Sequence, residues 1–407
     1  VQASGLGNIS IEGTGGGIAA SASNYGVLLS DSFGTGTKVL TAEGNISITG
    51  TGGAAAAGNL NQGVRIRNTS TLLTSVNGSI TITGTSGTGT NNEAFSLGGQ
   101  ALGGAITTTG SGDLTIIADS MLFETGSVNV GSNSVTLRQK TDDHQISLGA
   151  ADSTGILGLT DPELDLITAG IIRIGDANSG NLSVSADITP AATITLSLHS
   201  GGSITDTTGG LSLANLAVRG TSIVLDHANT DVTNLAGTST AVDGEFKFLN
   251  RASGGDLNVN GVDTEVGITT SNGAIAILVQ DSANVLTVSV DNPIDSGGGS
   301  IALIADAIEV SSAILAGANS VSLRQFTNST AITLGTEVGG ELSLTDDELD
   351  RITAGTLAIG DANSGSITVS AAITHAKTRN PKRFPVRLAG RERQMKPLQV
   401  PDFLDVS

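Results

Sequence analysis

The chain of 407 residues has no cysteine and no tryptophan, and it has only one tyrosine and eight phenylalanines. Without cysteine, disulfides, thiol nucleophiles and cysteine-ligated zinc sites are excluded. Aromatic residues make up 2% of the chain, whereas rings usually supply much of the buried area of a domain. Valine, isoleucine, leucine and alanine must therefore supply the apolar core.

Basic residues are also scarce, because 19 Lys and Arg stand against 38 Asp and Glu, giving a formal net charge of -19. Nucleic acids and anionic membrane surfaces are bound by clustered Lys and Arg, so neither is an expected partner. No apolar run approaches the roughly 18 residues of a transmembrane helix. The chain starts without Met or a basic leader followed by an apolar segment, and we expect an interior piece of a longer polypeptide.

Glycine is abundant, with 56 residues, about twice the usual share. Between glycine-rich stretches, short phrases alternate apolar with small polar residues, which is the pattern of a half-buried strand. The clearest phrases start at Gly7 (GNISI), Gly44 (GNISI) and Gly78 (GSITI). The chain is therefore predicted to be a succession of short strands separated by turns.

A longer duplication lies over this pattern. Thr160 to Thr189 (TDPELDLITAGIIRIGDANSGNLSVSADIT) returns as Thr345 to Thr374 (TDDELDRITAGTLAIGDANSGSITVSAAIT), a shift of 185 residues. Short strands that cannot bury a face alone stack in coils, each strand pairing with its copy one coil later. We predict an all-β fold, a right-handed parallel β-helix with short capped helical insertions and roughly 20 to 25 residues per coil. A β-sandwich array and a β-propeller remain alternatives, although both usually carry more aromatic core residues.

Four segments are predicted: glycine-rich short-strand repeats over residues 1–111, a first long repeat over 112–298, a second, truncated one over 299–374, and a basic tail over 375–407. The tail holds eight of the 19 basic residues and four of the seven prolines. It abandons the alternating pattern that continues after Thr189 in the first copy. We expect it to be disordered or loosely packed, and either non-native sequence or a basic arm.

The densest acidic cluster is Asp161, Glu163 and Asp165, repeated as Asp346, Asp347, Glu348 and Asp350. Paired acids could cleave a glycosidic bond. The pattern fits a helix start better, because Thr160 and Glu163 form a capping box with a proline in the first turn, and Gly170 is expected to end the helix. These acids are therefore predicted to be structural.

The turn Gly175–Gly180 (GDANSG), identical at Gly360–Gly365, offers oxygen ligands for Ca²⁺ but lacks the spacing of a calcium loop. We favour an Asx turn. The phrase Gly50 to Ala55 loosely matches a dinucleotide fingerprint without the acid that should follow. Asp142, Asp143 and His144 could polarise a water, but Asn328, Ser329 and Thr330 replace them in the second copy. No catalytic, cofactor-binding or metal-ligating residue is assigned, and no cofactor is expected.

The phrases LTDPELDLITAGIIRIGDANSG and LTDDELDRITAGTLAIGDANSG, with the run SIVLDHAN at Ser222 to Asn229, resemble repeats of filamentous-haemagglutinin-like bacterial exoproteins. The resemblance covers roughly residues 100 to 374. It implies an exported adhesin on the cell surface or outside the cell, built on right-handed β-helical stalks.

The sequence thus predicts a non-enzymatic structural stalk of a secreted or surface adhesin, whose receptor would be a surface, a glycan or a protein. The alternatives are a polysaccharide-active β-helix lyase or glycosidase and a calcium-rigidified binding module. The scarcity of Tyr and Trp favours the stalk, since sugar sites commonly stack rings on aromatic side chains.

Overall fold

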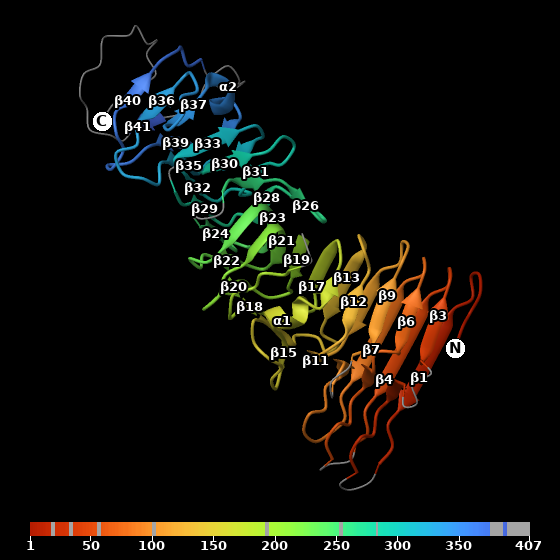
Figure 1. Cartoon of the computed structure of the whole chain (residues 1–407). Helices are drawn as coiled ribbons and strands as arrows, with labels where there is room; N and C mark the ends of the chain where they lie inside the picture. Colours follow the sequence, from red (N-terminus) through yellow and green to blue (C-terminus); the bar gives the residue numbers. More distant parts are fainter. Residues whose placement is uncertain are drawn as a thin grey trace. The chain divides into compact units, whose positions relative to one another are not determined.

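The computed structural model describes residues 1–17, 21–31, 36–54, 58–99, 103–191, 195–251, 255–281 and 284–374, together with the backbone of 386–388. These residues divide into two compact units, 1–203 with 207–209 and 204–206 with 210–407. Among the described residues, the paired strands run parallel except for one hairpin. The predicted fold class, an all-β parallel β-helix with short helical insertions, is confirmed (Figure 1).

In the first unit, successive strands of each ladder come from successive coils, with three ladders in its N-terminal coils. The first ladder is β1 (Ile9–Thr14), β4 (Ile46–Thr51), β7 (Ile80–Thr85), β10 (Leu114–Ile117), β13 (Ser134–Arg138), β17 (Ile171–Gly175) and β19 (Thr195–His199). The second is β2 (Val27–Ser30), β5 (Val64–Arg67), β8 (Phe95–Leu97) and β11 (Met121–Phe123). The third is β3 (Lys38–Thr41), β6 (Leu72–Ser75), β9 (Ala105–Thr108), β12 (Ser127–Asn129) and β16 (Ile167–Thr168).

An insertion follows β13 in this unit. It contains β14 (Gln145–Leu148), β15 (Ile156–Leu159) and the single-turn helix α1 (Asp161–Leu164), and β18 (Leu182–Val184) pairs with β14. The predicted helix end at Gly170 is wrong, because α1 ends after one turn and Ile167 already pairs with Val128 of β12. Gly170 instead serves a close approach, since a Cβ there would lie 2.3 Å from the carbonyl oxygen of Ser132.

The second unit repeats the plan. One ladder is β20 (Ile204–Asp206), β22 (Ile223–Leu225), β24 (Phe246–Asn250), β29 (Ile275–Val279), β32 (Ile301–Ile304), β35 (Ser320–Arg324), β39 (Thr356–Ile359) and β41 (Val386–Leu388). Another is β21 (Ser212–Gly220), β23 (Asp231–Val242), β28 (Ile268–Ser271), β31 (Ile294–Asp295), β34 (Ile314–Leu315) and β38 (Ile352–Thr353). The third is β25 (Leu257–Val259), β30 (Val285–Val288) and β33 (Ala307–Val310).

The corresponding insertion follows β35. It contains β36 (Ile332–Leu334), β37 (Leu342–Leu344), the single-turn helix α2 (Asp346–Leu349) and β40 (Ile367–Val369), which pairs with β36. The antiparallel hairpin is β26 (Gly261–Val262) with β27 (Glu265–Val266). Neither helix of the described residues is long and apolar enough to cross a membrane.

The core consists of aliphatic rows that run from coil to coil. Ile46 lies opposite Ile9 and Ile80 in the parallel register, and Ile48 lies opposite Ile82. Their alternation with exposed or half-buried Ser and Thr places one row inside and the next outside. The few rings join these rows, as with Phe95 and Phe123, whose centroids are 5.4 Å apart.

Coil length departs from the prediction. Bonded positions on neighbouring coils are 37 residues apart between Asn8 and Asn45 and 34 apart between Asn45 and Ser79, and the spacing falls to 21 between Asp113 and Ser134. The glycine-rich coils are longer than assumed because segments such as 52–63 are inserted between strands.

The ladders continue across the predicted segment limits at 111 and 298. The compact units divide near residues 204–210. The segments describe repeats of the sequence, and their limits stay a prediction. In the predicted tail, Val386–Leu388 forms β41, parallel to β39, and the remainder of 375–407 lies outside the described residues. The expectation that the tail is disordered or non-native therefore stays a prediction.

Candidate functional site

The duplicated acids at the helix starts are bound to backbone groups. Glu163 Oε2 accepts hydrogen bonds from the backbone N–H and the hydroxyl of Thr160, at 2.9 and 2.8 Å. Glu348 does the same for Thr345, with both distances 2.9 Å, and the Thr345 hydroxyl accepts from the Glu348 N–H. Both helices thus start with the predicted capping box.

Three of the aspartates in this cluster also accept N–H groups. The Oδ1 atoms of Asp161 and Asp346 accept from Thr189 and Thr374, each at 2.6 Å. The Asp165 carboxylate accepts from the Ala191 N–H at 2.8 Å. These bonds give the carboxylates a structural role. They connect the helix starts to residues 189–191 in the first copy and to Thr374 in the second.

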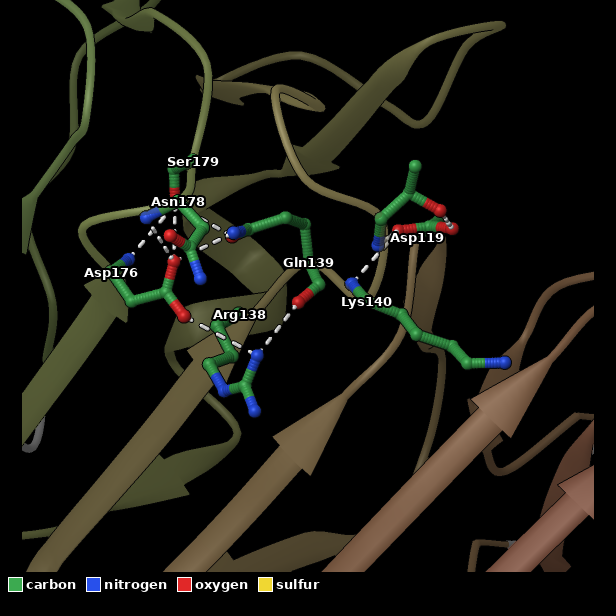
Figure 2. A network of polar contacts seen from close by, with 8 residues as sticks. Asp119, Arg138, Gln139, Lys140, Asp176, Asn178 and Ser179 are labelled. Carbon is green, nitrogen blue, oxygen red and sulfur yellow. Dashed lines mark hydrogen bonds and ion pairs between the residues drawn. The ribbon is translucent and has the colours of Figure 1, made fainter.

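Each of the two Gly-Asp-Ala-Asn-Ser-Gly turns forms a polar network with the preceding coil. Figure 2 shows the network of the first turn. Asp176 Oδ1 accepts from the Gln139 side-chain amide at 2.7 Å and from the Asn178 N–H at 2.9 Å, while its Oδ2 lies 3.3 Å from Arg138. The Ser179 hydroxyl donates to Gln139 Oε1 at 2.6 Å. The bond from Asn178 to Asp176 confirms the predicted Asx turn.

The second copy reproduces the network. Asp361 accepts from the Gln325 amide and the Asn363 N–H, both at 2.8 Å, and Arg324 lies 3.6 Å away. Burial works to raise the pKa of Asp176 and Asp361, but the hydrogen bonds and the neighbouring arginine together hold each pKa below its usual value. Both carboxylates are therefore ionised, and both accept hydrogen bonds from protein groups. Over the described ranges, no three His, Cys, Asp or Glu side chains gather as metal ligands.

A second kind of carboxylate–backbone contact recurs at the strand ends. Asp119 Oδ1 accepts the N–H groups of Lys140 and Thr141, both at 2.8 Å, one coil later (Figure 2). Asp306 makes the same pair of bonds with Phe326 and Thr327 at 2.8 and 2.7 Å. Much of the chain's acidity thus serves to satisfy backbone donors at turns.

The Asp142 to His144 segment forms a turn rather than a water-activating site. Asp143 has φ 60°, and its N–H donates to the Asn178 carbonyl at 2.8 Å. Ser329 occupies the same place in the second copy with φ 67° and the matching bond to Asn363. The glycine phrase at Gly50 is followed by β5, where a dinucleotide site would need a helix.

The sequence did not indicate two polar groups, the buried Arg65 and the half-buried Asp152. Arg65 is 4% exposed, and it donates to Gln62 Oε1 at 3.1 Å and to the Tyr25 hydroxyl at 3.3 Å, with Gln62 in turn donating to Glu93. Asp152 accepts from the Met121 N–H at 2.7 Å and the Gly158 N–H at 2.8 Å. Burial, with nearby Glu163 and Glu93, raises the pKa of Asp152 to about 7 against the opposing pull of these bonds.

Comparison with known proteins gives no relative for this chain. No protein-family model, no curated protein and no solved structure matches it.

Proposed function

We propose that this chain is a non-enzymatic structural segment of an adhesin-like exoprotein, a stalk of stacked coils that presents a binding region. The observation that carries the proposal is the use of its acids. The carboxylates that a β-helix hydrolase or lyase would employ accept backbone N–H groups in both copies of the long repeat, as Glu163 and Glu348 do. The adhesin part rests on the resemblance of the repeat phrases, and it implies export to the cell surface or the medium.

The duplication itself favours a structural role. The turn network of Asp176 and Gln139 returns at Asp361 and Gln325 with the same bonds. A catalytic site needs one set of groups around one substrate, whereas a stacked scaffold gains from repeating each fastener. The same bonds argue against a calcium-rigidified module, because the Asp176 and Asp361 carboxylates already accept hydrogen bonds from protein donors.

The polysaccharide-active alternative keeps one observation in its favour. Asp152 and Glu163 lie near each other, and the raised pKa of Asp152 is a property that general acids share. Glu163 is only 8% exposed, however, and both of its oxygens are occupied by protein donors. A sugar would have to displace those bonds before either carboxyl group could act.

The test of the proposed function is an adhesion assay. Beads coated with the folded chain should be retained on bacterial cells, epithelial cells or a glycan surface, while beads coated with the heat-unfolded chain should wash off. Retention that is equal for the folded and unfolded chain, or absent on every surface, would contradict the presentation of a binding region.

A further inference from the structure

The second ladder of the first unit ends at β11, and two carboxylates cover its last edge. Within the ladder, the Val64 N–H donates to the Ala94 carbonyl and the Phe95 N–H to the Ser120 carbonyl, at 2.9 and 3.1 Å. Met121 is in register with Phe95, but its N–H donates to Asp152 Oδ2 at 2.7 Å. The Phe123 N–H donates to Glu163 Oε1 at 3.1 Å.

These side chains thus replace the carbonyl groups of a missing next strand. Parallel strands need such partners, because an unpaired buried N–H costs free energy comparable to a lost hydrogen bond. Asp152 comes from the loop between β14 and β15, and Glu163 comes from α1. Two acids from separate segments therefore clamp one end strand.

In the second unit, one carboxylate of the corresponding pair bonds the end strand. The third ladder there ends at β33, whose Val310 N–H donates to Glu348 Oε1 at 2.8 Å. Glu337 stands where Asp152 stands, at the same shift of 185 residues that separates Glu163 from Glu348. Its Oε2 accepts from the Ser343 hydroxyl at 2.7 Å, and the neighbouring Glu348 helps to raise its pKa.

Negative charge surrounds both pairs. Asp152 faces Glu163 from α1 and Glu93 from the residues before β8. Glu337 faces Glu348 from α2 and Glu309 from β33. In the described part of the chain, no Lys, Arg or His forms an ion pair with any of these six groups, and the buried Arg65 reaches Glu93 only through Gln62.

We propose that two acid-strengthened clamps, Asp152 with Glu163 at β11 and Glu348 beside Glu337 at β33, hold the end strands more tightly as the medium becomes mildly acidic. Two neighbouring carboxylates with little access to solvent repel each other, as Asp152 and the buried Glu163 do. When one proton enters a pair, this repulsion disappears. The other oxygens keep accepting the strand N–H groups.

The sign of the effect follows from linkage. Burial and the neighbouring acids raise the pKa of Asp152 to about 7 and raise the pKa of Glu337, so the folded chain binds protons that the unfolded chain releases. Stability is therefore greatest below the ordinary carboxyl pKa of about 4, and it falls as pH rises through about 7. Asp119, Asp176 and Asp361, whose pKa values are lowered, give the opposite slope.

The test is amide hydrogen exchange of Met121, Phe123 and Val310 in the full chain at pH 8, 6.5 and 5, corrected for intrinsic exchange rates. We expect the protection factors to rise about tenfold or more from pH 8 to pH 5, the effect of a pKa shift of one unit or larger. The changes Asp152→Asn and Glu337→Gln should flatten this rise at their own clamps. Asp142→Asn, an exposed acid in the same coil, is the matched control and should keep it.

A second variant keeps the test informative if Asp152→Asn fails to fold. Glu93→Gln leaves both clamp carboxylates and can still accept from Gln62, but it removes one repelling charge. It should move the rise in Phe123 protection to lower pH without abolishing it. Protection that falls on acidification in the unmodified chain, or a pH profile unchanged by both Asp152→Asn and Glu93→Gln, would overturn the proposal.

Discussion

Glycine at three stacked positions makes room for a neighbouring carbonyl group. Gly13, Gly50 and Gly84 lie opposite one another in the register of β1, β4 and β7. A Cβ at Gly50 would lie 2.2 Å from the carbonyl oxygen of Gly63, and one at Gly84 would lie 2.0 Å from that of Ala94. No real Cβ tolerates such a contact, so these glycines are fixed by packing and not by turn geometry.

The change Gly50→Ala should therefore lower the free energy of unfolding by about 1 to 3 kcal/mol, the usual cost of overpacking. Gly16→Ala is the matched control, because no atom lies within 4 Å of its Cβ position, and there the change should be neutral or stabilising by about 0.4 to 1 kcal/mol through the unfolded chain. Urea unfolding followed by circular dichroism measures both. Equal effects at the two positions would contradict the packing argument.

Aspartate in the GDANSG turns acts as an acceptor for protein donors, which gives a prediction for calcium. Because Asp176 and Asp361 are held by amide, backbone and arginine donors, neither Ca²⁺ nor its removal should move the melting temperature. Scanning calorimetry with excess EDTA and with millimolar Ca²⁺ checks this. A large downward shift on chelation that Ca²⁺ reverses would show that the turns hold an ion.

Among the elements, the two helices are single turns whose stability depends on their caps. The Thr345 hydroxyl bonds Glu348 in both directions, and Glu348 also covers the edge of β33. A helix of this length has almost no stability of its own, because nucleation is costly. The cap therefore holds a tertiary contact as well as a helix.

Thr345→Ala should destabilise the chain by about 1 kcal/mol, the typical cost of losing an N-cap side chain. Thr345→Ser keeps the hydroxyl and should stay close to the unmodified chain. Denaturant unfolding of the three proteins compares them directly. An equal loss in the alanine and serine variants would show that the methyl group, and not the cap, is what matters.

Local patterns predicted most of the elements. The alternation around Ile46 and Ile80 predicted strands, and Thr160 with Glu163 predicted the capping box, because both are set by residues close in the chain. The predicted length of α1 was wrong because Ile167 pairs with Val128 of β12. This tertiary pairing overrides the local helix signals.

The clamp around Asp152 could not be predicted for the same physical reason. Its partner Met121 lies 31 residues earlier, and the register between coils depends on the lengths of the intervening loops. The sequence does carry one signal that was available, namely that Asp152 and Glu337 hold equivalent places in the duplication. In each copy, an acid in the insertion, Asp152 or Glu337, precedes the capped helix.

For the whole molecule, the scarcity of rings and the excess of acids have a common explanation. Stacked aliphatic rows fill the core, and carboxylates satisfy backbone N–H groups where ladders end or turns begin. The acidity is thus part of the scaffold as well as a source of solubility. In a chain built in this way, these carboxylates already accept hydrogen bonds from the protein and are not free to act on a substrate.

The most direct measurement of this central claim is polysaccharide turnover. The purified chain, Asp152→Asn and Glu163→Gln are incubated with a panel of neutral and uronate-containing polysaccharides at pH 5 to 8, and new reducing ends and unsaturated products are followed. We expect no turnover by any of the three proteins. Cleavage by the unmodified chain that is lost in either folded variant would show that these carboxyl groups are catalytic and would contradict it.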